Sequence, residues 1–221
     1  IKQAELNPSD TAIIFEGTKR TYGEFAQRVR SLAGLLRGAG VCVGDRVGFL
    51  GFNQPSFIET MFATVSLGAI FVPLNFRLTG EELAFIIDDA GVHSLIVDPD
   101  LVPVVQSVSE RLPCRHFYSV HGALDGFACL ESDLSVAEPV SEIATSSPHD
   151  TLLIMYTSGT TGLPKGAMLT HGNIVWNNVN ASLAFGANKS DVLLTAAPLF
   201  HIGGLNVMTI SAFQMGSPLV L

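Results

Sequence analysis

The chain has few charged residues. Only 14% of its 221 residues are Asp, Glu, Lys or Arg, whereas about 25% is usual for a globular domain. Basic residues are the scarcer kind, with 12 Lys and Arg against 20 Asp and Glu, so the formal net charge is −8. Nucleic acids and anionic lipid surfaces attract basic faces, so the sequence predicts no nucleic acid partner and no electrostatic docking on a membrane.

Cysteine is also sparse. Cys42, Cys114 and Cys129 are odd in number and show no CxxC spacing, which is typical of inert thiols in a reducing compartment. The segment 1–5 has neither the basic start nor the apolar stretch of a secretory signal. We therefore predict a cytoplasmic location. Because the first residue is not Met, we also expect the chain to begin inside a longer product.

Two long runs lack charge altogether. Segments 60–76 and 192–221 contain no Asp, Glu, Lys or Arg. A membrane-spanning helix needs about 20 mostly apolar residues, and Pro and Gly interrupt both runs. We therefore predict buried strands and helices here and no transmembrane segment. A peripheral contact with a membrane stays open.

Strand-like and helix-like segments alternate along the chain. Thr21 with Glu24, and Thr79 with Glu82, have the spacing of capping boxes that begin helices. Repeated β-α-β order predicts an α/β fold of mostly parallel sheets flanked by helices. Strands are expected at 12–15, 47–50, 70–74, 94–97, 116–120, 151–155, 167–169, 192–196 and 218–221. Further helices are expected at 54–67, 102–111, 171–185 and 203–215.

A change in amino-acid composition at segment 136–150 divides the chain. Segment 136–150 is rich in Ser, Pro, Glu and Ala and has no periodic apolar face, which favours a surface linker. It separates an amino-terminal α/β subdomain, 1–135, from the start of a second subdomain, 151–221. There are no internal repeats and no low-complexity tract.

A Gly- and hydroxyl-rich loop follows an apolar strand at 152–155. Ser158 to Gly162 are all Ser, Thr or Gly, and Lys165 comes three residues later. Such a loop supplies backbone N–H groups, hydroxyls and a point charge to phosphate oxygens. It is not a Walker A motif, because Pro164 stands where that motif has Gly and Gly166 where it has Ser or Thr. The alternative is a surface hairpin that happens to be rich in Gly and Thr.

Several segments together resemble the adenylate-forming superfamily, which includes acyl-CoA synthetases, aryl-CoA ligases, luciferases and peptide-synthetase adenylation domains. The resemblance covers nearly all of the chain, and its phosphate-loop motif is specific to the superfamily. Segment 198–204, Pro-Leu-Phe-His-Ile-Gly-Gly, resembles the CoA-ligase branch. The matching segments are Tyr156-Thr157-Ser158-Gly159-Thr160-Thr161-Gly162, Pro164-Lys165-Gly166, Thr21 to Phe25, Gly44 to Val47, Gly68-Ala69, Val72 to Asn75, and Pro198 to Gly204.

The resemblance implies a two-step reaction. A carboxylate attacks the α-phosphate of ATP to give an acyl-adenylate and pyrophosphate, and the thiol of CoA then displaces AMP. It implies Mg²⁺ beside ATP and CoA, with the Thr157 hydroxyl at the Mg²⁺ site. The residues that it places on the β- and γ-phosphates are Thr157, Ser158, Gly159, Thr160, Thr161, Gly162 and Lys165. The alternatives are a strand-end hydroxyl bonded to backbone for Thr157 and a solvated loop charge for Lys165.

The same resemblance implies a substrate-side role for His201, as a gate or positioner; Lys165 and His201 are the candidate catalytic residues. The alternative for His201 is a hydrogen-bonded core histidine. Gly203 and Gly204 follow it at the start of a predicted helix. They leave room either for an acyl chain or for close packing of the helix on a strand.

The sequence thus predicts the amino-terminal part of the large domain of an acid–thiol ligase that forms AMP, with fatty acids as the first candidate substrates. An aryl-acid ligase of the 4-coumarate type is the nearest alternative. The other is a non-catalytic fragment that serves only as a folding or interaction module. We expect the 221 residues alone to be inactive, and the remainder of the polypeptide or a partner chain to cover exposed core.

Overall fold

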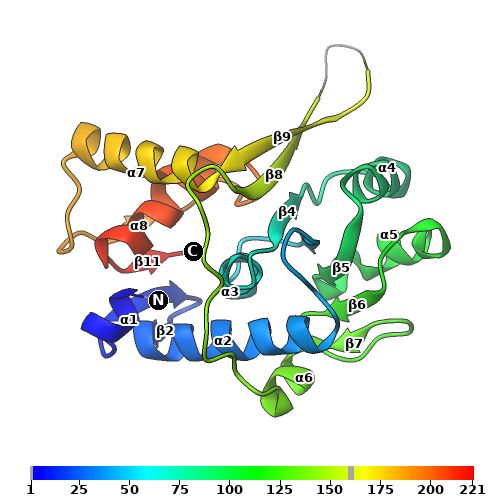
Figure 1. The fold of residues 1–221 in the computed structure, drawn as a ribbon, viewed down its shortest axis with the longest axis horizontal. Helices are drawn as coiled ribbons and strands as arrows, with labels where there is room; N and C mark the ends of the chain where they lie inside the picture. The colour runs from blue at the N-terminus through cyan, green and yellow to red at the C-terminus, as the bar shows by residue number, and fades with distance from the viewer. Residues whose placement is uncertain (1, 159–161) are drawn as a thin grey trace.

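The computed structural model describes residues 2–158 and 162–221 (Figure 1). The strands are β1 (Thr11–Phe15), β2 (Thr18–Thr21), β3 (Arg46–Leu50), β4 (Ile70–Leu74), β5 (Val92–Val97), β6 (His116–Ser119), β7 (Ala128–Cys129), β8 (Thr151–Thr157), β9 (Lys165–Thr170), β10 (Leu193–Leu194) and β11 (Leu219–Val220). The α-helices are α1 (Lys2–Leu6), α2 (Tyr22–Gly38), α3 (Pro55–Ser66), α4 (Gly80–Ala90), α5 (Val102–Gln106), α6 (Leu130–Val136), α7 (His171–Phe185) and α8 (Ile210–Met215).

The predicted α/β fold is confirmed. Among the described residues, seven strands form one sheet in the order β7-β6-β5-β3-β4-β8-β9. Neighbouring strands run parallel from β7 to β8, and only β8 and β9 pair antiparallel. The carboxyl ends of the parallel strands therefore share one edge, and the β8–β9 hairpin extends from it (Figure 1).

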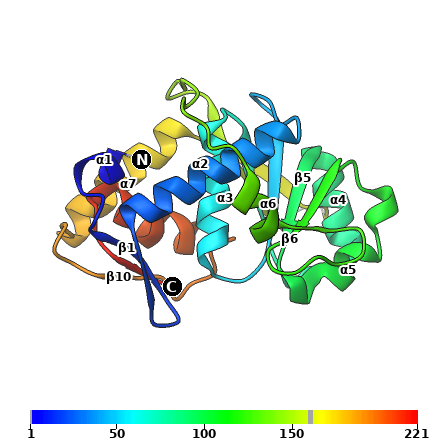
Figure 2. The ribbon, with the colours of Figure 1, turned by 90° about the horizontal axis from the view of Figure 1, so that it is seen from below.

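Helices cover both faces of this sheet. On one face, Phe49 of β3 and Phe71 of β4 pack with Phe57 of α3 in a core that includes the apolar side of α2. On the other face, Leu50 and Val72 pack against α4 and α5. Figure 2 shows α2 and α3 together and α4 and α5 on the opposite side of β5. The alternation of side chains along each strand explains why these strands are apolar throughout.

A second, smaller sheet joins the two ends of the chain. Its order is β10-β11-β1-β2, with β11 parallel to both β10 and β1. Both sheets thus combine strands from either side of segment 136–150. The division into subdomains 1–135 and 151–221 stays a prediction, and it does not coincide with a boundary between sheets.

Local sequence signals set the starts of α2 and α4. Thr21 and Glu24 form a capping box at α2, and Thr79 and Glu82 form one at α4, each worth about 1 kcal/mol. Gly91 ends α4 at φ 60°, in the left-handed region that glycine tolerates.

Four predictions differ from the structure, and the first is the strand at 192–196, of which only β10, Leu193–Leu194, forms. Segment 102–111 is not one helix, because α5 ends at Gln106 and only a 3₁₀ turn, Ser109–Arg111, follows. Segment 203–215 divides into a π-helix, Gly203–Thr209, and α8. The helix α6 extends one residue into the predicted linker. In the part of the chain that the structure describes, no helix combines the length and apolarity needed to cross a bilayer.

Candidate phosphate and acid site

The predicted phosphate loop connects two antiparallel strands. Thr157, the last residue of β8, pairs with Lys165, the first residue of β9. Both are exposed, and their cross-strand pairing places the hydroxyl and the ammonium group on one face of the hairpin. Gly162 has φ 92° and so adopts a backbone conformation that suits glycine. Of the predicted phosphate ligands, Gly159, Thr160 and Thr161 lie outside the described residues.

The loop end of the hairpin is fastened to α4. The Tyr156 hydroxyl donates a hydrogen bond of 2.5 Å to the Asp89 carboxylate. Burial, together with this bond, raises the pKa of Tyr156. The Tyr156 ring lies over Gly166 on the facing strand, where a Cβ would stand 3.1 Å from the ring and 2.8 Å from Ile154. Gly166 therefore lets this ring lie flat across the hairpin.

A hollow of about 510 Å³ opens beside the loop. Leu74 and Phe85 form part of its apolar wall, Thr157 and Pro164 bring the two sides of the loop to it, and Phe200 closes one side. The site thus lies at the carboxyl edge of a parallel sheet, where such sheets commonly bind ligands.

Two carboxylates on the wall of this hollow already have partners. Glu81 forms an ion pair with Arg111 at 2.6 Å, and Glu82 accepts hydrogen bonds from Thr79. These interactions hold the pKa of both carboxyl groups below its ordinary value. Both side chains therefore stay ionised at neutral pH and would repel an unshielded phosphate.

His201 lies in a segment that crosses to the same edge. It is exposed among the described residues and is therefore not part of the core that these residues form. Its Nδ1 accepts a hydrogen bond of 3.2 Å from the backbone N–H of Gly203. The imidazole is therefore turned toward the start of the π-helix, and the proton of a neutral ring resides on Nε2.

The two glycines after His201 have different surroundings. Gly204 is buried, and a Cβ there would strike the carbonyl oxygen of Pro198 and approach that of Ala197 to 2.7 Å. A Cβ at Gly203 would meet only the His201 ring, at 3.4 Å from Nδ1. Gly204 thus permits close packing, whereas Gly203 leaves space beside the imidazole.

Comparison with known proteins places this arrangement in a family. The sequence model of the family described as AMP-binding enzyme matches residues 1–221. The chain belongs to the AMP-binding enzyme family. The resemblance to adenylate-forming enzymes seen in the sequence is confirmed.

Individual members of the AMP-binding family match at moderate identity. Feruloyl-CoA synthase from Amycolatopsis sp. is 40% identical over 225 residues, which is 100% of this chain and 42% of that protein. A long-chain-fatty-acid–CoA ligase from Thermus thermophilus is 38% identical over 189 residues, 83% of this chain and 34% of that protein. The solved structure of the anthranilate CoA ligase AuaEII with anthranoyl-AMP matches with a TM-score of 0.91 and 26% sequence identity. The match covers 99% of this chain and 43% of that chain. The chain spans less than half the length of these relatives.

The donor set suits a nucleotide phosphate of the kind this family binds. Lys165 offers a cation and Thr157, its cross-strand partner, offers a hydroxyl, and Ser158 adds a second hydroxyl at the start of the loop. For Mg²⁺ the described residues give less, because no three His, Cys, Asp or Glu side chains among them gather as a metal site. Mg²⁺ keeps several waters and takes phosphate oxygens as ligands, so the Thr157 hydroxyl fits as one ligand among these.

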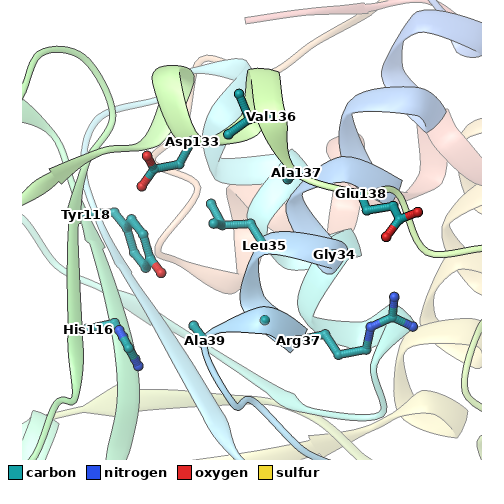
Figure 3. Close-up of a pocket in the computed structure, with 11 residues that line it drawn as sticks. Gly34, Leu35, Arg37, Ala39, His116, Tyr118, Asp133, Val136, Ala137 and Glu138 are labelled. Atoms are coloured by element: carbon teal, nitrogen blue, oxygen red, sulfur yellow. The ribbon is translucent and has the colours of Figure 1, made fainter.

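A second hollow lies away from the loop. It occupies about 680 Å³ between the end of α2, β6 and α6. Figure 3 shows Tyr118 and His116 on one side of it, with Arg37 and Asp133 at its rim. None of the predicted phosphate or acid residues lines this hollow. Among the described candidates, Thr157, Ser158 and Gly162 line the smaller hollow at the loop, whereas Lys165, His201, Gly203 and Gly204 line neither hollow.

Sequence reasoning missed three residues that hold the site in place. Tyr156 and Asp89 fasten the hairpin, and Asn53 binds the backbone before Phe200 through both ends of its side-chain amide. Tyr156 is the first residue of the loop motif, but no role for it was predicted from the sequence. Asp89 and Asn53 are separated from their partners by 67 and 144 to 146 positions, and no local pattern marks such contacts.

Proposed function

We propose that the protein activates a carboxylic acid with ATP, as an acyl-adenylate, and transfers the acyl group to CoA. Membership of the AMP-binding family and the names of the relatives support the reaction type. The observation that carries the proposal is the pairing of Thr157 with Lys165 at the base of the Gly- and Thr-rich loop. This pairing gives a phosphate both a hydroxyl and a cation.

The proposed roles follow the charge changes of the reaction. A carboxylate oxygen attacks the α-phosphorus, and the bond to the bridging oxygen breaks as pyrophosphate leaves. Negative charge grows on the leaving group, so a fixed cation at Lys165 would stabilise the transition state more than the bound ATP. When bound beside Thr157, Mg²⁺ would neutralise further phosphate charge. In the second step the CoA sulfur attacks the acyl carbon and AMP leaves.

Two classes of carboxylic acid are candidate substrates. Fatty acids are the first candidates from the sequence, and the Thermus thermophilus relative carries that name. The aryl alternative gains support from feruloyl-CoA synthase, which matches the whole chain at higher identity. Aromatic side chains at the site agree with it, because Phe85 and Phe200 both line the hollow.

His201 and Gly203 are the proposed acid-side residues. The exposed imidazole is held by the Gly203 N–H, and the open space beside it is where a side chain at position 203 would reach. Gly204, proposed from the sequence as part of the pocket, is better explained by packing against the carbonyl groups of Ala197 and Pro198.

Other chain segments would complete this site. Trp176, Leu183 and Phe185 of α7 are 69%, 79% and 62% exposed, an unusual density of apolar surface. We propose that further polypeptide or a partner chain covers α7. Peripheral membrane contact is the competing explanation of this surface.

The cytoplasmic location stays a prediction, supported by three cysteines without a disulfide.

The experiment is a product assay on the full-length gene product with ATP, Mg²⁺, CoA and a panel of fatty and aryl acids. We expect AMP, pyrophosphate and an acyl-CoA of the matching mass with at least one acid. The class with the larger kcat/KM identifies the substrate. Formation of ADP, or no acid-dependent product from folded protein, would overturn the proposal.

A further inference from the structure

The side-chain amide of Asn53 binds one backbone segment at two points. Its Nδ2 donates to the carbonyl oxygen of Ala197 at 2.9 Å, and its Oδ1 accepts from the N–H of Leu199 at 2.9 Å. The two bonds span Pro198, which has no N–H to offer. A side-chain amide matches this donor and acceptor pair, whereas a carboxylate or an apolar side chain does not.

Asn53 is itself held by the large sheet. It lies in the short connection between β3 and α3. The next residue, Gln54, is buried and donates to the Asp98 carboxylate at 2.7 Å. The Asp98 N–H in turn bonds the carbonyl of Leu50, the last residue of β3, at 2.8 Å. Asn53 therefore holds segment 197–199 at a fixed position relative to the edge of the large sheet.

Aromatic contacts place the end of that segment. Phe52, beside Asn53, packs on Phe76 with ring centroids 4.8 Å apart, and Phe76 packs on Phe200 at 5.3 Å. Phe200 lines the hollow at the phosphate loop, and His201 follows it. The backbone clamp and the ring contacts thus converge on Phe200 at the hollow and on the adjoining His201, a proposed acid-side residue.

We propose that Asn53 is a positioning residue for the acid-activation step, acting through Phe200 and His201 rather than on substrate. The inference rests on the proposed function. Displacement of a catalytic segment by about 1 Å can reduce a rate about 100-fold. The phosphate loop is fastened separately, through Tyr156 and Asp89. Loss of Asn53 should therefore affect use of the acid more than binding of ATP.

The first measurement reads the clamp directly. In the full-length gene product, Asn53→Ala removes the acceptor for the Leu199 N–H, so amide hydrogen exchange in the peptide covering 197–201 should become at least several-fold faster. Gln106→Ala is the matched control, because its amide also donates to a backbone carbonyl, that of Asp125, at 2.9 Å. Unchanged exchange at 197–201 in Asn53→Ala would overturn the inference.

The second measurement separates positioning from general support of the fold. We expect Asn53→Ala to lower kcat/KM for the acid about 10- to 100-fold, with the KM for ATP changed less than about threefold. Gln106→Ala should match wild type in both values. Equal loss for acid and ATP, or no loss beyond the control, would contradict a positioning role.

Asn53→Asp separates the two bonds of the clamp. A carboxylate keeps the acceptor for Leu199 but presents negative charge to the Ala197 carbonyl. An Asp side chain has an ordinary pKa of about 3.9, so it is ionised at neutral pH and offers no donor. Asn53→Asp should therefore lower kcat/KM for the acid at least as much as Asn53→Ala. Wild-type kcat/KM for the acid in Asn53→Asp would overturn the inference.

The same assays test the role of Asn53 separately from the proposed function. If the wild type forms acyl-CoA and the Asn53 variants behave as Gln106→Ala does, only the positioning role of Asn53 is refuted. Wild type that forms neither acyl-CoA nor AMP with either class of acid refutes the proposed function, and the positioning role falls with it.

Discussion

Thr157 and Lys165 face each other across the β8–β9 hairpin, although seven residues separate them in the chain. The pair closes the Gly- and Thr-rich loop with a hydroxyl on one strand and an ammonium group on the other. The antiparallel register sets this relationship, because directly opposite residues project to the same face of the sheet. A phosphate at the mouth of the loop would be within the field of both groups.

Lys165→Ala should slow adenylate formation. The charge on the departing pyrophosphate loses a fixed partner, and removal of one such contact lowers a rate about 10- to 1000-fold. The thiol step, started from synthetic acyl-adenylate, should change far less. Single-turnover rates of the two half-reactions in the full-length gene product check this.

Lys19→Ala provides the control for a lost surface charge. Lys19 is exposed on β2, in the smaller sheet. It should leave both half-reactions unchanged. If Lys165→Ala slows both steps equally, Lys165 acts on folding or on a domain movement, and its assignment to the leaving phosphate is wrong.

Gly204→Ala should destabilise the protein where Gly203→Ala does not. At position 204 a methyl group would press on backbone carbonyl oxygens, which cannot turn away, and overpacking of this kind costs about 1–3 kcal/mol. At position 203 the methyl group has ordinary contact with the His201 ring. Urea unfolding curves of the two variants give the comparison.

Activity adds a second distinction between these glycines. Gly203→Ala should alter kcat/KM among acids of different size, since its methyl group enters the space beside the imidazole. Folded Gly204→Ala should reduce kcat/KM for all acids by a similar factor. A size-dependent change confined to Gly204→Ala would reverse the assignment of packing and pocket roles.

The Tyr156–Asp89 hydrogen bond should give a measurable coupling energy in the free energy of unfolding. Tyr156→Phe keeps the ring over Gly166 and removes the hydroxyl that donates to Asp89. In a double-mutant cycle with Asp89→Asn, the free energies of unfolding should fail to add by about 1 kcal/mol. Strict additivity would show that the 2.5 Å contact contributes no stability.

The cysteines should alkylate at different rates. Burial raises the pKa of Cys114 to about 12, whereas hydrogen bonds from Ser132 lower the pKa of Cys129. Because the thiolate is the reactive form, a raised pKa leaves Cys114 protonated between pH 7 and 9. Iodoacetamide labelling followed by peptide mass analysis should find Cys129 modified well before Cys114 throughout this range. Faster labelling of Cys114 in folded protein would contradict the burial described here.

Local patterns were sufficient for much of the fold. The capping boxes at Thr21 and Thr79 begin α2 and α4 where the sequence predicts, because the bonds that form them lie within one helical turn. The apolar strands β3, β4 and β5 follow from runs of buried side chains between turns. The antiparallel return at β9 was anticipated only in the surface-hairpin alternative, since period and composition do not reveal which way a strand pairs.

Contacts between distant segments explain what was missed. The two sheets mix strands from both ends of the chain, so the break in composition at 136–150 says nothing about how strands pair. Gly204 looks identical to Gly203 in the sequence, and only the fold brings the Pro198 carbonyl against one of them. For Gly159, Thr160 and Thr161 the assignment to phosphate rests on the loop motif.

The most direct test of the account is acid-dependent exchange of labelled pyrophosphate into ATP by the full-length gene product, without CoA. Acyl-adenylate formation is reversible, so exchange should require the acid and Mg²⁺, stop on chelation of the metal, and fall about 10- to 1000-fold in Lys165→Ala. Absence of exchange with both fatty and aryl acids, from protein that is folded, would contradict the proposed activation of a carboxylic acid at this loop.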